Sequence, residues 1–409
     1  MISPESYEVL PLKVSNLLFD VQNKIIADVA RRINRMNKLS STSEYQLDRL
    51  SEIKQFETNY RQELSTATGR TLIEIERLYE DAAQEAYIYD ERLFEAKGIP
   101  MVPYSENLWL QQITQSMANQ TKEEFTNLTQ TIGFRGETGE FLKLRDFFVK
   151  KLDETEFIVS TGAMSYDQAI KDVVREMVES GLRTVKYEKR TDSVEVATRR
   201  AVMTGMGQIS AQVSIKNITD LGVKHVQVSW HSTARTGEGI NNHAGWQGFI
   251  YALNGFNLST MIRDTAESDK SYKDFIDTTG YGDVRGLHGA NCRHSFSGFD
   301  PEVQTPNYTP AELAEKEKQE LKEKEFEFRD GTIRKFNRDQ ATQQMRSMEV
   351  AMKKQRALAN GYKAGGNDEA YTSSKAMYRG QLAEYNKFAK SMGLQPEMQR
   401  VYVDGIGKL

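Results

Sequence analysis

The sequence contains few of the residues that mark disulfide-linked, secreted or membrane-spanning proteins. It has one cysteine, Cys292, so no intramolecular disulfide can form, and we expect a reducing compartment. Only 38% of the 409 residues are hydrophobic, and no run approaches the roughly 18 apolar residues that suggest a transmembrane helix. The first twenty residues lack the basic start and long apolar run of a signal peptide. This composition predicts elongated helices with much solvated surface.

A strong charge of one sign is also missing. The chain has 54 Lys and Arg against 58 Asp and Glu, a net charge of -4, so no global positive field draws it onto nucleic acid. The acidic residues do not form a recognisable acid-base pair. The glycine-rich stretch 280–289 lacks the Gly-Lys-Ser/Thr ending of a phosphate-binding loop, which argues against nucleotide binding.

One segment departs from this balance, because residues 334–363 carry eight basic and two acidic side chains. A solvated helix face or a contact to an acidic partner is the interpretation we favour, and sequence-independent contact with DNA phosphates is the alternative. The basic residues singled out for DNA or partner contact are Arg334, Lys335, Arg338, Arg346, Lys353, Lys354 and Arg356.

Helical periodicity dominates the chain. Apolar residues recur at three- and four-residue steps from Leu18 to Met36, which predicts one buried helical stripe. Prolines, glycines and serines suggest where helices end, with breaks expected at Pro11, at 40–43 and at Gly69. The further predicted helices cover about 43–65, 71–96, 108–130, 141–152, 165–180, 193–221, 311–326 and 373–392.

The period changes after residue 222. Residues 223–230 alternate as a strand does, and 249–253 form a second short candidate strand. We therefore predict a mainly α fold with a small α+β module and elongated helical N-terminal and C-terminal regions. The predicted division is a helical bundle or arm (1–100), a helical middle region (101–184), the α+β module (185–300) and a charged helical C-terminal region (301–409).

The chemically versatile residues gather in that module. Residues 224–299 hold all five histidines, the cysteine and two of the three tryptophans. One interpretation is a zinc site formed by His231, His243, Cys292 and His294, with His288 as a substitute, although zinc ligands are usually more closely paired in sequence.

Two other interpretations remain for the same residues. A thiolate–imidazole pair at Cys292, assisted by Asn291, would perform nucleophilic catalysis, but the surrounding sequence matches no known nucleophile motif. We favour a structural role, in which neutral histidines and aromatic rings hold together a module poor in aliphatic residues.

Two pieces of the module, residues 226–253 and 279–301, carry a family resemblance. Their matching features are Trp230-His231, Arg235, His243-x-x-Trp246-Gln247-Gly248, Gly282 and the run Gly289-Ala290-Asn291-Cys292-Arg293-His294. A second block runs from Ser160 through Leu182. The sequence resembles the phage minor capsid protein 2 family, which is related to the minor head proteins of head morphogenesis in Mu-like phages. The resemblance covers the last 250 residues or so well, and the first 150 mainly through their helical character.

The resemblance implies a minor structural protein of the phage head, at or near the portal vertex. It would act in head assembly and, beyond that, in DNA packaging or ejection. Expected partners are the portal protein, the major capsid protein, further copies of the chain and, non-specifically, packaged DNA. We expect no catalytic residue and no cofactor, and a location in the virion and, during assembly, in the host cytoplasm. The alternative is a metal-dependent or Cys/His enzyme module, acting on nucleic acid or the cell envelope and carried in the virion.

Overall fold

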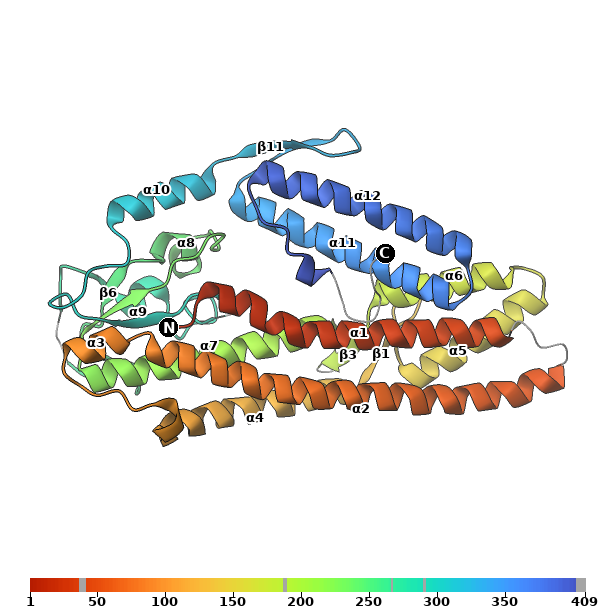
Figure 1. Ribbon diagram of the computed structural model, residues 1–409, viewed down its shortest axis with the longest axis horizontal. Coiled ribbons are helices and arrows are strands. Elements are labelled where there is room, and N and C mark those ends of the chain that lie inside the picture. The colour runs from red at the N-terminus through yellow and green to blue at the C-terminus, as the bar shows by residue number, and fades with distance from the viewer. Residues whose placement is uncertain (37–41, 187–189, 266–267, 290–291, 402–409) are drawn as a thin grey trace.

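The protein is a long bundle of helices with a smaller α+β module at one end (Figure 1). The computed structural model describes residues 1–36, 42–186, 190–265, 268–289 and 292–401. The predicted fold class, mainly α with a small α+β module, is confirmed.

Two long antiparallel helices lie at the centre of the bundle: α1 (Pro4–Met36) and α2 (Thr42–Ile88). They pack with α4 (Leu108–Gln130), α7 (Val194–Leu221) and α11 (Arg338–Ala364). The remaining helical segments are α3 (Glu91–Ala96), η1 (Tyr104–Glu106), α5 (Leu144–Ser160), α6 (Tyr166–Ser180), η3 (Gly239–Asn241), α8 (His243–Trp246), α9 (Phe275–Thr279), α10 (Pro310–Leu321), α12 (Asp368–Met392) and η4 (Met398–Arg400).

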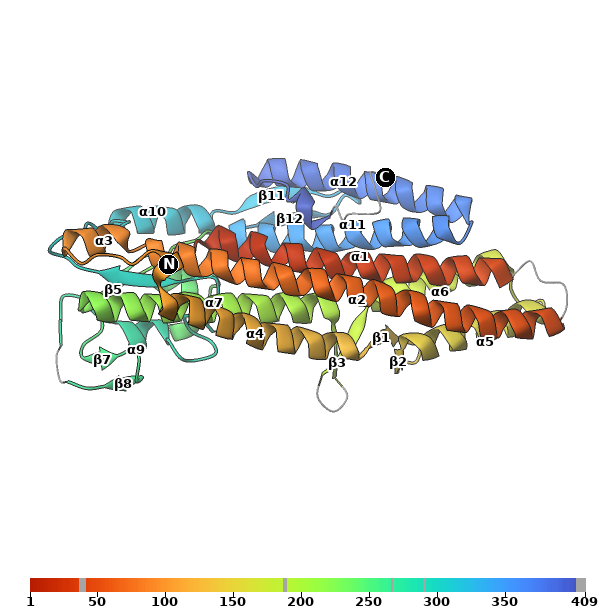
Figure 2. The same ribbon diagram turned by 60° about the horizontal axis from the view of Figure 1, so that its bottom comes forward.

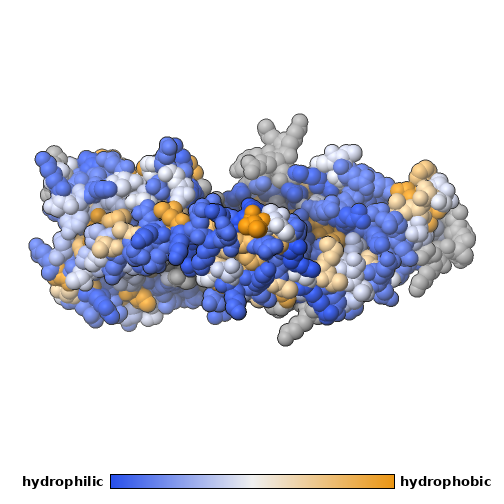
Figure 3. Space-filling model, turned by 90° about the horizontal axis from the view of Figure 1, so that it is seen from above, coloured by the Kyte–Doolittle hydropathy of each residue, from blue (hydrophilic) through white to orange (hydrophobic). Residues whose placement is uncertain are grey.

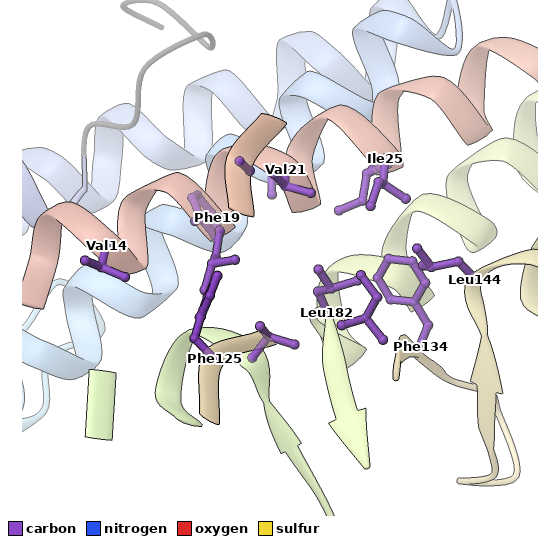
Figure 4. Packing of buried hydrophobic residues seen from close by; sticks show 14 of the residues in the cluster. Val14, Phe19, Val21, Ile25, Phe125, Phe134, Leu144 and Leu182 are labelled. Carbon is purple, nitrogen blue, oxygen red and sulfur yellow. The ribbon is translucent and has the colours of Figure 1, made fainter. Parts of the chain in front are cut away.

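One hydrophobic core runs along the bundle and takes side chains from all four predicted regions. The predicted stripe of α1 is its centre, since Val21, Ile25 and Ile33 are fully or almost fully buried. Figure 4 shows this helix facing residues that arrive from distant parts of the chain. The labelled side chains are Val14, Phe19, Val21, Ile25, Phe125, Phe134, Leu144 and Leu182.

A four-stranded antiparallel sheet lies beside the bundle, between α4 and α5 (Figure 2). Its order is β2-β1-β3-β4, with β1 (Ile132–Arg135), β2 (Phe141–Lys143), β3 (Arg183–Lys186) and β4 (Arg190–Ser193). The sequence predicted a loop at 133–139 and a helix from 141, which is wrong: α5 begins at Leu144. Gly133 allows the strands to approach, because a Cβ there would lie 1.9 Å from the carbonyl oxygen of Leu142.

The α+β module contains a second sheet of order β10-β5-β6-β9. Its strands are β5 (His225–Val228), β6 (Ile250–Ala252), β9 (Lys273–Asp274) and β10 (Phe296–Phe299), and a small hairpin of β7 (Phe256–Asn257) and β8 (Ile262–Arg263) lies nearby. Both predicted strands are confirmed. The last turns of α7 pack on this sheet through Ile215 and Ile218, so one helix serves both cores.

The C-terminal region has its own smaller core between α11 and α12. The predicted cap at Thr309 is confirmed as a capping box with Glu312. The predicted continuation of that helix to residue 326 is wrong, because α10 ends at Leu321. A hairpin of β11 (Lys324–Glu327) and β12 (Ile333–Phe336) follows, and buries Phe326 and Phe336 against α12.

Two predicted breaks are also wrong. Helix α2 continues through Gly69, whose glycine penalty of about 1 kcal/mol is outweighed by the packing on either side. Helix α1 continues through Pro11, which is buried.

The surface agrees with the low hydrophobic content. Figure 3 shows one face that is mostly hydrophilic, with small and separate hydrophobic patches. Among the helices that the structure describes, none combines the length and apolarity needed to cross a membrane.

Candidate functional site

The ends of two paired strands bring the histidine-rich segments together. Phe296 of β10 pairs with Val228 of β5. Beyond this pair, Ser229 N donates to Ser295 O over 2.9 Å, and Ser295 N donates to Ser229 Oγ over 3.0 Å. His231 follows one strand and His294 precedes the other, so both lie at the same end of the sheet.

Three of the four predicted ligands form a cluster. One candidate ligand atom from each of His243, Cys292 and His294 lies within 4.8 Å of the other two. The Sγ atom of Cys292 is 3.6 Å from Nδ1 of His294, and the ring centroids of His243 and His294 are 5.4 Å apart. Residues 49 positions apart in the sequence therefore share one small site.

The hydrogen bonds of Gln247 determine which ring nitrogen of His294 carries the proton. Gln247 Oε1 accepts the backbone N–H of His231 over 3.0 Å, which identifies this atom as the oxygen. His294 Nε2 lies 3.0 Å from the same oxygen and must donate to it. We therefore assign the neutral tautomer with a proton on Nε2, which leaves the Nδ1 lone pair directed toward Cys292.

His243 has the same tautomer for a different reason. Its Nε2 lies 2.8 Å from the carbonyl oxygen of Arg285, an atom that can only accept. The proton is therefore on Nε2, and Nδ1 carries the lone pair. The ring also packs on Trp246, with centroids 4.5 Å apart.

The fourth predicted ligand, His231, and its proposed substitute, His288, lie outside this group. The ring of His231 stacks on His294, with centroids 4.1 Å apart, and its Nδ1 lies 2.8 Å from the carbonyl oxygen of Ser232. His288 lies with its ring edge-on to Phe296 and is outside the three-residue group. Its backbone is left-handed, with φ 59°.

Burial keeps the cluster uncharged at neutral pH. Desolvation, strengthened by the neighbouring histidines, holds the pKa of His294 well below its usual range. Desolvation also lowers the pKa of His243. Burial raises the pKa of the Cys292 thiol to about 11. A thiol with so high a pKa is a poor nucleophile, so the geometry gives little support to cysteine catalysis.

The aromatic and basic members of the predicted signature stabilise the loops around the cluster. Trp246 is buried and donates from Nε1 to Ile240 O over 3.0 Å. Lys316 Nζ lies 4.1 Å from the centre of the Trp230 ring, which joins the module to α10. Arg235 Nη1 donates to Asn241 Oδ1 over 2.9 Å, and Arg293 Nη2 donates to Thr233 Oγ1 over 3.2 Å.

The signature glycines occupy positions that a side chain would disturb. Gly248 has φ 79°, and a Cβ there would lie 2.6 Å from Leu313 Cδ2. Gly282 has φ 96°, and a Cβ on Gly289 would lie 2.3 Å from Val284 O. The remaining signature residue, Asn291, lies outside the described residues.

A groove of about 370 Å³ separates the module from α10 and the start of α11. Its lining includes Trp230, Gln247, Leu313 and Glu317. Among the residues that the structure describes, His243, Cys292 and His294 do not line this groove. Gln247 lines the groove and is also hydrogen-bonded to His294 of the cluster.

Three of the predicted DNA-contact residues have partners within the chain: Lys353 and Arg356 are buried, and Arg346 is half-buried. Arg346 pairs with Glu349 and Glu397 at 3.2 and 3.0 Å. Lys353 Nζ pairs with Glu195 at 2.7 Å. Arg356 is fully buried, with its guanidinium 5.4 Å from the Tyr378 ring centre. All three side chains are engaged within the chain, which leaves them little available for an exposed contact surface.

The other four basic residues remain at the surface. Arg334, Lys335 and Lys354 are exposed, and Lys335 lies 3.4 Å from Glu325 across the hairpin. Arg338 is also exposed but donates to Ser232 Oγ over 2.6 Å, which ties α11 to the module.

Gln247 is the functional residue that sequence reasoning did not single out. It was part of the matching run, but nothing about a glutamine in a loop indicates that its oxygen will orient a histidine 47 positions away. The carbonyl of Arg285 could not be identified either, because every residue has one.

The chain matches the family model described as phage minor capsid protein 2 over residues 2–390. No curated protein and no solved structure matches it. The family match extends through the bundle, the module with its histidine–cysteine cluster, and most of the C-terminal region. The chain therefore belongs to the phage minor capsid protein 2 family, and is a structural protein of a bacteriophage virion.

Proposed function

We propose that the protein acts at or near the portal vertex of the phage head, where it helps to organise head assembly. The observation that carries this proposal is the family match over nearly the whole chain. The proposed partners are the portal protein, the major capsid protein and further copies of the chain. Assembly would take place in the host cytoplasm, and a role in DNA packaging or ejection belongs to the same proposal.

The shape of the protein supports a role in assembly. A long bundle held by one core along its length offers an extended and largely hydrophilic side for several weak contacts. Interfaces of this polarity are common in complexes whose members also exist separately. The module at one end provides a second kind of surface, so one chain can contact different partners along its length.

We also propose that the protein is not an enzyme. The Cys292 thiol is protonated at neutral pH and lies away from the groove. An enzyme acting on nucleic acid or cell envelope would need reactive groups that a large substrate can reach. The support for a structural role is that the cluster is enclosed by hydrogen bonds and aromatic rings.

The portal position can be tested by comparing heads assembled with and without the portal protein. Quantitative mass spectrometry would give the copies of this chain relative to the major capsid protein in each preparation. We expect incorporation to fall to background when the portal protein is missing. Equal incorporation in both preparations would contradict a portal-vertex location while leaving the family assignment intact.

A further inference from the structure

We propose that Cys292, His294 and His243 bind one divalent transition-metal ion of the zinc class, which closes the loops of the α+β module around it. This site is independent of the proposed role at the portal vertex. The ligands come from two segments of the module: Cys292 and His294 precede β10, and His243 begins α8.

The distances suit a tetrahedral ion. Zinc lies about 2.3 Å from sulfur and about 2.0–2.1 Å from nitrogen, so a tetrahedral site separates sulfur from nitrogen by about 3.6 Å and two nitrogens by about 3.3 Å. The separation of Cys292 Sγ from His294 Nδ1 is 3.6 Å, and one candidate ligand atom of each of the three residues lies within 4.8 Å of the other two. The other separations, of up to 4.8 Å, exceed these ideal values by up to about 1.5 Å, so the side chains must move closer when the ion binds.

The tautomers are those that a metal site requires. In both histidines Nε2–H donates to an oxygen. The acceptor is the side-chain oxygen of Gln247 for His294 and the backbone oxygen of Arg285 for His243. Both Nδ1 lone pairs are therefore available. Metal-binding histidines usually have their second nitrogen held in this way by a carboxylate, a carbonyl or water. The same hydrogen bonds would also hold the two rings in place in the absence of a metal.

His231 is our candidate for the fourth ligand, because its ring lies beside that of His294. Its ring stacks on His294 at a centroid separation of 4.1 Å, although it lies outside the three-residue group. A fourth protein ligand would make the site closed and structural, whereas a water there would make it open. Cys292 binds as a thiolate, so its proton passes to solvent when the metal enters, and binding weakens as the pH falls.

The test uses the full-length, untagged protein. Elemental analysis after removal of loosely bound ions should give about one zinc per chain. Replacing zinc with Co²⁺ should then give a sulfur-to-cobalt charge-transfer band. Cys292 is the only cysteine in the chain, so this band can arise from no other residue. Stoichiometric metal with the band supports the proposal, and metal-free protein or cobalt without the band overturns it.

Variants locate the other ligands. Cys292→Ser and His243→Ala should lose the metal, whereas the matched control His225→Asn, a histidine of the same module bonded to Asp269 outside the cluster, should retain it. Gln247→Ala should weaken zinc affinity about 10–100-fold, because it removes the oxygen that orients His294. Retention of zinc by Cys292→Ser would overturn the proposal. If that variant does not fold, the cobalt spectrum of the unaltered chain decides.

Discussion

Ser295 Oγ donates a hydrogen bond to the backbone carbonyl oxygen of Ile2 over 2.8 Å, although 293 positions separate the two residues. Both residues are fully buried. Ser295 lies between His294 and the first residue of β10, so the start of the chain is bonded to the edge of the histidine–cysteine cluster. The bundle and the module are therefore parts of one folded unit at this point, and loss of the bond should weaken both.

Replacing Ser295 with alanine should lower the free energy of unfolding by about 1–3 kcal/mol, because the buried Ile2 carbonyl loses its donor. Urea denaturation followed by circular dichroism measures this change. Ser259→Ala is the matched control, since Ser259 is exposed in the same module, and it should change the value by less than about 0.5 kcal/mol. Equal effects of the two variants would show that the Ser295–Ile2 bond does not stabilise the fold.

Gly205→Ala should destabilise the protein even though alanine favours helices. A Cβ at Gly205 in α7 would lie 1.9 Å from Tyr79 Oη and 2.9 Å from Thr121 Oγ1. These two hydroxyls are hydrogen-bonded to each other at 2.6 Å, where α2, α4 and α7 meet. Overpacking of this kind costs about 1–3 kcal/mol, more than the gain of about 1 kcal/mol in helix propensity. The melting temperature should fall.

Gly69→Ala is the opposite case and serves as the control. Gly69 lies within α2, and a Cβ there meets no atom within 4 Å. The substitution should therefore raise stability by up to about 1 kcal/mol, measured in the same thermal experiment. If both substitutions changed the stability in the same direction, the packing argument would be refuted, because only the surroundings of the two glycines differ.

The helices were predictable where local signals agree with packing. Ser165 caps α6, and Gly181 and Gly222 end α6 and α7, as the sequence indicated. The predicted break at Gly69 was wrong because a glycine in an exposed helical position weakens a helix without ending it. The hairpin of β11 and β12 was missed since its alternating charged residues also fit a helix, and only Phe326 and Phe336 mark its buried face.

The site was predictable in its membership but not in its geometry. The gathering of rare residues indicated His243, Cys292 and His294, whereas the sequence could not show that His231 stacks on this cluster or that His288 packs on Phe296. Loop conformation decides that difference, and it depends on contacts between segments far apart in the chain.

The spacing of Arg346, Lys353 and Arg356 carried information that a count of charges ignores. The steps from 346 to 353 and from 353 to 356 are seven and three residues, which keeps these side chains on one helical face. Met345 and Met352 are buried beside them. Their spacing therefore marked them as part of the packed face of α11.

His288 should make stability depend on pH below neutrality. Burial lowers the pKa of His288 from its usual 6.5 to about 4, so as the pH falls the unfolded state takes up the proton first. The stabilisation is fully present above pH 6.5 and is lost as the pH approaches 4, by about 3 kcal/mol. His288→Asn removes the titration, and asparagine tolerates the left-handed backbone.

The measurement is the free energy of unfolding of both proteins at several pH values from 7 to 4. The variant should lose about 3 kcal/mol less than the unaltered chain over this range. A constant offset between the curves reports lost packing alone, so only the difference in slope tests the titration. Parallel curves would contradict the prediction.

The exposed basic residues of the C-terminal hairpin provide the remaining test of DNA contact. Arg334 and Lys335 are exposed, whereas Arg346, Lys353 and Arg356 of α11 have partners within the chain. If the hairpin binds packaged DNA through phosphates, the affinity for duplex DNA should fall steeply with salt. Substituting both residues with glutamine should reduce the slope of log K against log salt by about 2, since each phosphate contact contributes about 0.9.

Fluorescence anisotropy with a labelled duplex at several salt concentrations measures that slope. The matched control is Lys54→Gln with Arg70→Gln, which removes the same charge from exposed positions of α2. Equal changes in the two double variants would mean that net charge alone governs binding. Salt-independent or absent binding by the unaltered chain would remove DNA from the proposed partners. The hairpin would then be left as a solvated surface or a contact to an acidic protein, because its exposed charges would have no phosphate to neutralise.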